Sequence, residues 1–294
     1  MKTIYKIFQS AYGGFLGFAC FVKSKYSFKN KIKIFQAWVK INIKSIFLAR
    51  LLRLPIKEEN ILGYKISAFN YDSIKFLFEE IFFKSHYFVE LKNKKPVIFD
   101  CGANIGVASV FFKWMYPESE IFAFEPDKNT FELLKKNIIQ NRLENVSLFN
   151  FALTDKEGKI DFFTDSLKQG SLTMSENSGR TPSDQKILVD SACLSGIIRK
   201  KSVERIDLIK MDIEGSEKKV MEDLYKNNQL GIVSNFIVEY HHKIARQKSA
   251  LGEFLLIFEK NNFEYQINTG GSLGGFSDKF QDILIYASRE INFI

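Results

Sequence analysis

Two apolar runs of the sequence are followed by residues that could bind a nucleoside. After residues 97–99 come Asp100, Gly102 and Gly106, and glycines at a strand-to-helix turn let the backbone approach a ligand closely. Another run ends at Glu125, whose carboxylate could accept both hydroxyl groups of a ribose. Because Asp100 would repel a pyrophosphate, the two sites favour a nucleoside that carries a cationic amino-acid tail.

Two later runs, residues 206–211 and 235–238, are followed by acids and imidazoles that could accept a proton. These residues are Asp212, Glu214, Glu217, Glu239, His241 and His242. A histidine at this place is suited to act as a general base near neutral pH. Alternatively, Asp212, Glu214 and Glu239 bind a divalent ion that acidifies a hydroxyl group. Glu217 could also simply complement a helix dipole.

Alternating strand and helix signals position these residues. Strands are predicted from Val97 onward and at residues 61–69, 120–124, 146–151, 206–211, 235–239, 263–267 and 282–287. Helices are predicted at residues 72–84, with Asp72 as N-cap, and at 105–116, 128–142, 216–227 and 250–262. The pattern predicts an α/β fold in which ligands bind outside the carboxyl ends of parallel strands. All the candidate residues follow such strands, so we expect them to meet at one edge.

Two segments predict loops. Residues 164–186 are rich in Ser, Thr and Gly, which is typical of a mobile loop or a substrate lid. The glycines of residues 270–275 follow a strand instead of opening a helix, so a hairpin loop beside the acceptor site is expected there.

Four motifs resemble a known family. They are Asp100-x-Gly102-x-Asn104-x-Gly106, Phe124-Glu125-Pro126, Lys210-x-Asp212-x-Glu214-Gly215-x-Glu217 and Val238-Glu239. Together they resemble the FkbM family of S-adenosylmethionine-dependent methyltransferases over about residues 79–287. The resemblance implies a class I methyltransferase (Rossmann-like) sheet that is mostly parallel with an antiparallel last strand and has helices on both faces. It also implies methyl transfer, usually to a hydroxyl group of a sugar, glycan or secondary metabolite.

The resemblance further implies where S-adenosylmethionine binds. The methionine moiety would contact Asp100, Gly102, Asn104 and Gly106, the ribose Glu125, and the adenine would lie near Ala152. The catalytic candidates are Asp212, Glu239, His241 and His242, and a divalent metal is not expected although the acids leave that route open.

Two other functions remain as alternatives. A nicotinamide-dependent oxidoreductase of Rossmann type would share the ribose carboxylate but needs a G-x-G-x-x-G pattern that this turn lacks. A non-catalytic, membrane-attached nucleoside-binding module would keep the pocket without turnover.

The basic charge is concentrated in an N-terminal arm. The 294 residues carry a net charge of +8, but residues 1–60 alone carry +10 and residues 61–294 carry −2. A helix predicted at residues 31–54 has a broad apolar face, and Lys33, Lys40 and Lys44 fall within about 40° of one another around it. Such a helix suits either an anionic membrane surface or packing on protein, whereas nucleic acid is disfavoured. We therefore expect an arm at residues 1–60 and a methyltransferase domain at residues 61–294.

The cysteines and the first residues bear on location. Cys20, Cys101 and Cys193 have no metal-binding spacing, which fits a reducing cytoplasm. The charge-free residues 7–22 are shorter than the ~20 residues of a spanning helix, and no signal cleavage site follows them. The sequence predicts a cytoplasmic protein, with peripheral contact to the inner face of the membrane through residues 1–54 as an open option.

Overall fold

The computed structural model describes residues 18–19, 21–52, 54–164, 185–244, 248–269 and 281–289. The chain divides into two compact units, one of Met1–Glu90 with Ile139–Asn141 and one of Leu91–Ile138 with Arg142–Ile294. The first unit thus extends to Glu90, whereas the charge pattern had placed a boundary after Asn60. Residues 1–17 and 165–184 and the glycine loop at residues 270–275 lie outside the described residues.

A seven-stranded sheet forms the centre of the second unit. Its strand order is β11-β12-β10-β9-β3-β4-β5. The strands are β3 (Val97–Cys101), β4 (Glu120–Phe124), β5 (Val146–Phe149), β9 (Leu208–Met211), β10 (Asn235–His242), β11 (Glu264–Asn268) and β12 (Gln281–Ser288). Only β12 runs antiparallel to its neighbours β10 and β11. The expected Rossmann-like sheet, mostly parallel with an antiparallel last strand, is therefore confirmed.

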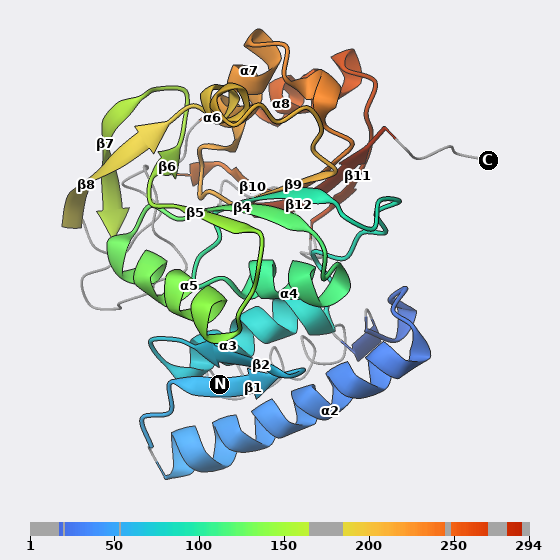
Figure 1. The fold of residues 1–294 in the computed structure, drawn as a ribbon, viewed down its shortest axis with the longest axis vertical. Helices are drawn as coiled ribbons and strands as arrows, with labels where there is room; N and C mark the ends of the chain where they lie inside the picture. Colours follow the sequence, from blue (N-terminus) through green and yellow to red (C-terminus); the bar gives the residue numbers. More distant parts are fainter. Residues whose placement is uncertain are drawn as a thin grey trace. The chain divides into compact units, whose positions relative to one another are not determined.

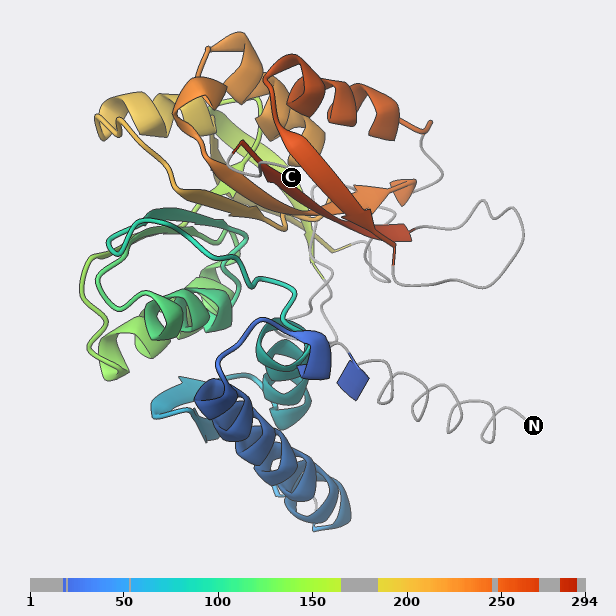
Figure 2. The ribbon, with the colours of Figure 1, turned by 90° about the vertical axis from the view of Figure 1, so that its right-hand side faces the viewer.

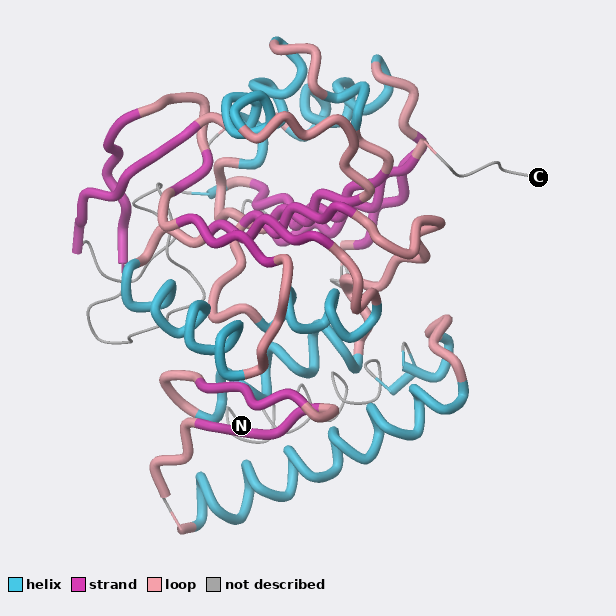
Figure 3. The backbone as a smooth tube through the Cα atoms, viewed as in Figure 1, coloured by secondary structure: helices cyan, strands magenta, loops and turns pink. Residues whose placement is uncertain are grey.

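Helices cover both faces of this sheet. On one face lie α4 (Val107–Met115) and α5 (Lys128–Gln140), and on the other lie α6 (Leu194–Lys200), α7 (Glu217–Lys226) and α8 (Leu251–Lys260) (Figure 1 and Figure 2). The strands run between these two helical layers (Figure 3). Buried side chains such as Phe99, Ile209 and Phe236 pack from the sheet against Leu194 and Phe254 of the second layer. Phe99, Ile209 and Phe236 belong to the apolar runs that predicted strands in the sequence.

A smaller sheet in this unit was not predicted. It has the order β6-β8-β7, formed by Ala152–Leu153, Gln185–Ala192 and Gly158–Thr164. β7 and β8 pair antiparallel from Gly158 and Ser191 to Thr164 and Gln185. Three residues at the ends of the segment expected to be a loop, Thr164, Gln185 and Lys186, therefore belong to this hairpin.

The first unit contains α2 (Phe28–Lys44), a π-helical continuation η1 (Ser45–Leu51), the hairpin β1 (Glu58–Ile61) and β2 (Tyr64–Ser67), α3 (Tyr71–Phe78) and η2 (Glu79–Phe83). The inner face of α2 is buried, and Trp38 stacks on Phe83 with ring centroids 4.9 Å apart. The N-cap of α3 is Asn70, whose side chain accepts a hydrogen bond from Ser73 N at 2.8 Å. The prediction of Asp72 as this cap was wrong, and Asp72 lies in the first turn.

Within the described residues, no helix is both long enough and apolar enough to cross a membrane.

Candidate functional site

The turn between β3 and α4 has a backbone that only particular residues can adopt. Gly102, Asn104 and Gly106 have positive φ angles of 79°, 50° and 87°. A Cβ atom on Gly102 would lie 1.8 Å from the backbone oxygen of Asp212, and one on Gly106 would lie 2.7 Å from Leu134 Cδ1. Gly102 is therefore required by close packing against backbone as well as by its conformation, whereas Gly106 is required mainly by its conformation.

The buried Asp100 stabilises this turn from inside the protein. Its carboxylate is fully buried, accepts a hydrogen bond from Ser109 Oγ at 2.6 Å and lies 3.4 Å from Lys210 Nζ. Lys210 in turn donates to the backbone oxygen of Gly102 at 2.7 Å. Burial lowers the pKa of Lys210, but Asp100 and Asp212 outweigh it and hold the pKa above its usual value. The structure thus gives the Asp100 carboxylate partners inside the protein and makes it part of the support of the turn.

Glu125 joins the turn to the end of β4. Its Oε2 accepts a hydrogen bond from Asn104 N at 3.0 Å, and its Oε1 accepts one from Asp127 N at 2.9 Å. Asn150 Nδ2 donates to the backbone oxygen of Glu125 at 2.9 Å, which fixes the loop after β4. Burial raises the pKa of the Glu125 carboxyl to about 8, although the N–H of Asp127 lowers it. A buried carboxylate at this place is an acceptor for hydroxyl groups of a ligand.

Ala152 belongs to β6. It pairs with Ser191 of β8 in parallel register and packs with Phe162 and Val189. The preceding Phe151 lies 5.8 Å from Phe124, measured between ring centroids. The apolar surroundings expected near an adenine are present at this strand end.

Carboxylates surround one buried imidazole beyond the end of β9. Nδ1 of His241 lies 2.7 Å from Glu217 Oε1. Its Nε2 lies 3.2 Å from Glu214 Oε2 and 3.8 Å from oxygens of both Asp212 and Asp282. Glu217 Oε1 also accepts a hydrogen bond from Gly215 N at 2.9 Å, which ties the loop before α7 to the cluster.

These contacts decide the charge of the imidazole. Burial lowers the pKa of His241, but Glu217, Glu214 and Asp212 outweigh it and raise the pKa to about 10. His241 is therefore a cation near neutral pH. Burial and the nearby Asp212 carboxylate raise the pKa of Glu239 to about 8, although His241 lowers it. Glu239, like Glu125, is thus a carboxyl group of this edge whose titration falls near neutral pH.

The two histidines lie on opposite faces of β10. Because β10 continues to His242, which pairs with Gln281 of β12, side chains alternate through this segment. His241 shares a face with Glu239, whereas His242 shares one with Tyr240, whose ring centroid lies 6.2 Å away. Burial and Lys243 lower the pKa of His242. The sequence suggested a pair of imidazoles, but the structure brings only His241 to the acids.

Three members of the site were missed or left without a role. Lys210 interrupts an apolar strand two residues before Asp212, and a lysine in a buried run was a signal that it has an internal partner. Glu217 was placed among the acids of this edge, with a helix dipole as its alternative, but it was not given the role of holding the imidazole. Asp282 had no local signal, because only the pairing of β12 with β10 places it opposite His241.

The cluster has the composition of a cation site. The ligand atoms of Asp212, Glu214 and His241 lie within 4.8 Å of one another, as do those of Glu239, His241 and Asp282. A protonated imidazole and a divalent ion would each neutralise these acids, so the geometry alone is compatible with both.

The chain is similar to known methyltransferases. A family model described as "Methyltransferase FkbM domain" matches residues 100–265. Methyltransferase sdnD of Sordaria araneosa is 28% identical over 63% of this chain and 80% of its own length. The 31-O-demethyl-FK506 methyltransferase FkbM of Streptomyces tacrolimicus is 25% identical over 72% and 88%. The 2-O-methyltransferase NoeI of Sinorhizobium fredii is 30% identical over 45% and 58%.

Proposed function

The chain belongs to the FkbM family of methyltransferases, and on that premise we propose that it uses S-adenosylmethionine to methylate a hydroxyl group of a sugar, glycan or secondary metabolite. The names of two similar proteins indicate methylation of an oxygen atom. One is a 2-O-methyltransferase, and the other is a methyltransferase of 31-O-demethyl-FK506. The family match favours a methyltransferase over the oxidoreductase and over the non-catalytic module.

The residues at the sheet edge fit this cofactor. Glu125 offers a buried carboxylate to ribose hydroxyl groups, and the turn from Gly102 to Gly106 brings backbone close to it. Asp212 and Glu214 make the neighbouring edge acidic, which favours a sulfonium and an ammonium group and disfavours the pyrophosphate of a dinucleotide. The single observation that carries the proposal is this order of glycine turn, ribose carboxylate and acidic cluster along one edge.

S-adenosylmethionine supplies the methyl group in an electrophilic form, so the protein has to orient the acceptor and remove its proton. We propose that Glu239 accepts the proton of the acceptor hydroxyl group, because its pKa of about 8 makes it a usable base near neutral pH. Asp212 is placed to hydrogen-bond the acceptor, since it lies at the end of β9 beside Glu239 of β10. His241 holds the acids together as a cation and does not itself accept the proton. His242 faces the other side of β10 and has no role in this assignment.

The second unit, Leu91–Ile138 with Arg142–Ile294, contains every residue of this mechanism. We propose that it carries the reaction, within the wider methyltransferase domain at residues 61–294. Cys101 and Cys193 are free thiols, which agrees with the cytoplasm as the proposed place of work.

The direct test is methyl transfer from isotopically labelled S-adenosylmethionine to a panel of acceptors. The panel would contain free sugars, lipid-linked glycans and hydroxylated secondary metabolites, with matched acceptors in which the hydroxyl group is replaced by hydrogen. We expect label on a hydroxyl oxygen of one class and none on its deoxy analogue. Label on nitrogen or carbon would contradict the O-methylation proposal.

Metal dependence is tested separately. We expect full methyl transfer after treatment with excess chelator, because the cationic His241 already provides a counter-charge in contact with Glu217 and Glu214. Loss of activity that Mg²⁺ restores would show instead that Asp212, Glu214 and their neighbours hold a divalent ion.

A further inference from the structure

The first unit exposes an apolar stripe along its longest helix. At intervals of three or four residues, α2 and η1 present large apolar side chains to solvent. They are Phe28, Ile32, Phe35, Ile43 and Ile46, with the partly buried Val39 between them. Phe28 is 80% exposed, Ile43 61% and Ile46 63%, which is far beyond the exposure of a packed face. The buried residues of α2, Ile34, Ala37 and Ile41, lie on the opposite side of the helix.

Lysines flank this stripe on one side. At about 100° per residue, Lys29, Lys33, Lys40 and Lys44 form a row roughly 100° from the centre of the stripe. Lys40 and Lys44 are bound to Glu59 of β1 at 2.8 Å and 2.9 Å, so they are not the free Lys face that the sequence suggested. Lys29 and Lys33 are exposed and form no ion pair with any described residue. The free charge therefore lies toward the beginning of α2.

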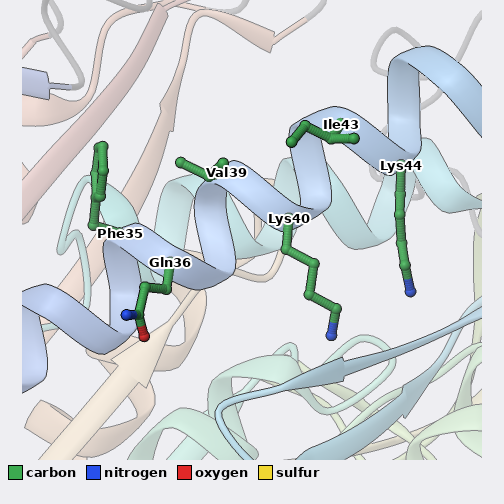
Figure 4. Close-up of a pocket in the computed structure, with 6 residues that line it drawn as sticks. All are labelled: Phe35, Gln36, Val39, Lys40, Ile43 and Lys44. Carbon is green, nitrogen blue, oxygen red and sulfur yellow. The ribbon is translucent and has the colours of Figure 1, made fainter.

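The stripe and the lysine row meet in a shallow groove lined by Phe35, Gln36, Val39, Lys40, Ile43 and Lys44. Figure 4 shows Phe35, Val39 and Ile43 extending to one side of α2, whereas Lys40 and Lys44 extend to the other. An apolar surface of this kind with basic residues at its border is the pattern of a helix that lies in the plane of a lipid interface.

We propose that the exposed face of α2 and η1, from Phe28 to Phe47, binds the surface of an anionic membrane. The apolar stripe would enter the acyl boundary, and Lys29 and Lys33 would reach the anionic headgroups. Charge complementarity supports this occupant, because residues 1–60 carry +10 while the rest of the chain carries −2. The inference goes beyond the proposed methyl transfer and does not depend on it.

A second copy of the chain fits this face less well. Each copy would bring the same row of lysines to the border of such a contact, and α2 contains no acidic residue to pair with them. A lipid surface supplies the opposite charge and also accommodates a long, narrow apolar stripe without a matching shape.

The test is partitioning of the full chain onto vesicles, measured by flotation. The vesicles contain either phosphatidylcholine alone or phosphatidylcholine with phosphatidylglycerol. The variants are Ile43→Glu with Ile46→Glu, and Lys29→Gln with Lys33→Gln. The matched controls lie in the second unit: Leu188→Glu, which changes a residue that is 66% exposed on β8, and Lys200→Gln with Lys260→Gln.

We expect the wild-type chain to float with anionic vesicles and to be released by added salt. The apolar double variant should bind roughly tenfold more weakly or worse, because each isoleucine loses its burial in lipid. Each neutralised lysine should weaken partitioning about fivefold. The controls should bind as the wild type does. The variants change exposed side chains. Circular dichroism and S-adenosylhomocysteine binding equal to those of the wild type would show that they still fold.

Three results would overturn the proposal. Wild-type protein that stays with the soluble fraction has no such surface, and equal flotation of wild type and the apolar variant places membrane binding elsewhere in the chain. A wild-type dimer that becomes monomeric in the apolar variant, without any vesicle binding, shows that a second copy covers this face.

Discussion

The environment of a side chain decides what His241 can do. A histidine near the ligand edge of a sheet is a natural general base when its pKa lies near 6.5. Here Glu217 binds Nδ1 at 2.7 Å and Glu214 lies 3.2 Å from Nε2, so the proton is held through neutral pH. We therefore propose that the imidazole is the counter-charge of the cluster and that a neighbouring carboxylate is the base.

Glu239→Gln tests that assignment. We expect kcat to fall by about 10²–10⁴-fold, the usual contribution of a general base, with little change in S-adenosylhomocysteine affinity. Because the ionised carboxylate is the active form, kcat/KM of the wild type should rise with pH through about 8. Steady-state rates and calorimetric titrations at several pH values measure both effects.

His241→Gln provides the matched comparison. Since the charge of His241 lowers the pKa of Glu239, its removal should move the inflection of kcat/KM above pH 8 without abolishing it. An unchanged rate in Glu239→Gln, or an inflection that disappears only in His241→Gln, would make the imidazole the base. Full activity in the double variant His241→Ala with His242→Ala would exclude both histidines from catalysis.

Glu125→Gln has a consequence for stability. The carboxyl has a pKa of about 8 in the folded chain and an ordinary value near 4.5 when unfolded. The folded state therefore binds the extra proton between these values, so its contribution is fully present below pH 4.5 and is lost as pH rises through 8. Urea unfolding at acidic and at mildly alkaline pH should show a smaller decline for Glu125→Gln than for wild type. Equal declines would show that Glu125 titrates normally.

The turn between β3 and α4 packs directly against the neighbouring strand β9. Gly102 is fixed by the backbone of Asp212 at the end of β9, and Lys210 from the same strand binds the oxygen of Gly102. The cofactor turn and the acidic edge are thus parts of one packed structure. A change at Gly102 should disturb both.

We expect Gly102→Ala to lose more stability than its backbone conformation alone would cost, which is about 1–3 kcal/mol. The control is Gly158→Ala, because Gly158 also has a positive φ of 123° but an added Cβ there meets no atom within 4 Å. Thermal unfolding and S-adenosylhomocysteine titration compare the two variants. Equal losses of stability and unchanged cofactor affinity in Gly102→Ala would contradict the close approach to Asp212.

Elements with a strong apolar signal were predictable from the sequence. The strand at residues 120–124 has the predicted bounds, and the helices after β3, β4, β9 and β10 were found within a few residues. The hairpin of β7 and β8 was missed because residues 165–184 separate the two strands, so their pairing leaves no local signal in the sequence. At the site, order along the chain indicated Glu125, Asp212 and Glu239, whereas Asp282 required the antiparallel pairing of β12.

In the whole molecule, the net charge of +8 is unevenly distributed along the chain. The methyltransferase residues lie in a part of the chain that is nearly neutral, and the basic residues concentrate in the first 60. Charge therefore bears on where the protein works, and the sheet edge bears on what it does. If membrane binding through α2 is correct, lipid-linked glycans become the first acceptors to try.

We propose that the sheet edge formed by Gly102, Glu125 and Asp212 binds S-adenosylmethionine. Calorimetric titration of the full chain with S-adenosylhomocysteine and, separately, with NAD tests it most directly, using Glu125→Gln as the comparison. We expect wild type to bind S-adenosylhomocysteine and not NAD, and Glu125→Gln to bind it about tenfold more weakly, because the amide replaces one of the two acceptor oxygens and leaves a backbone N–H of Asn104 or Asp127 without its acceptor. Binding of NAD instead, or equal affinity of the two proteins for S-adenosylhomocysteine, would contradict the account.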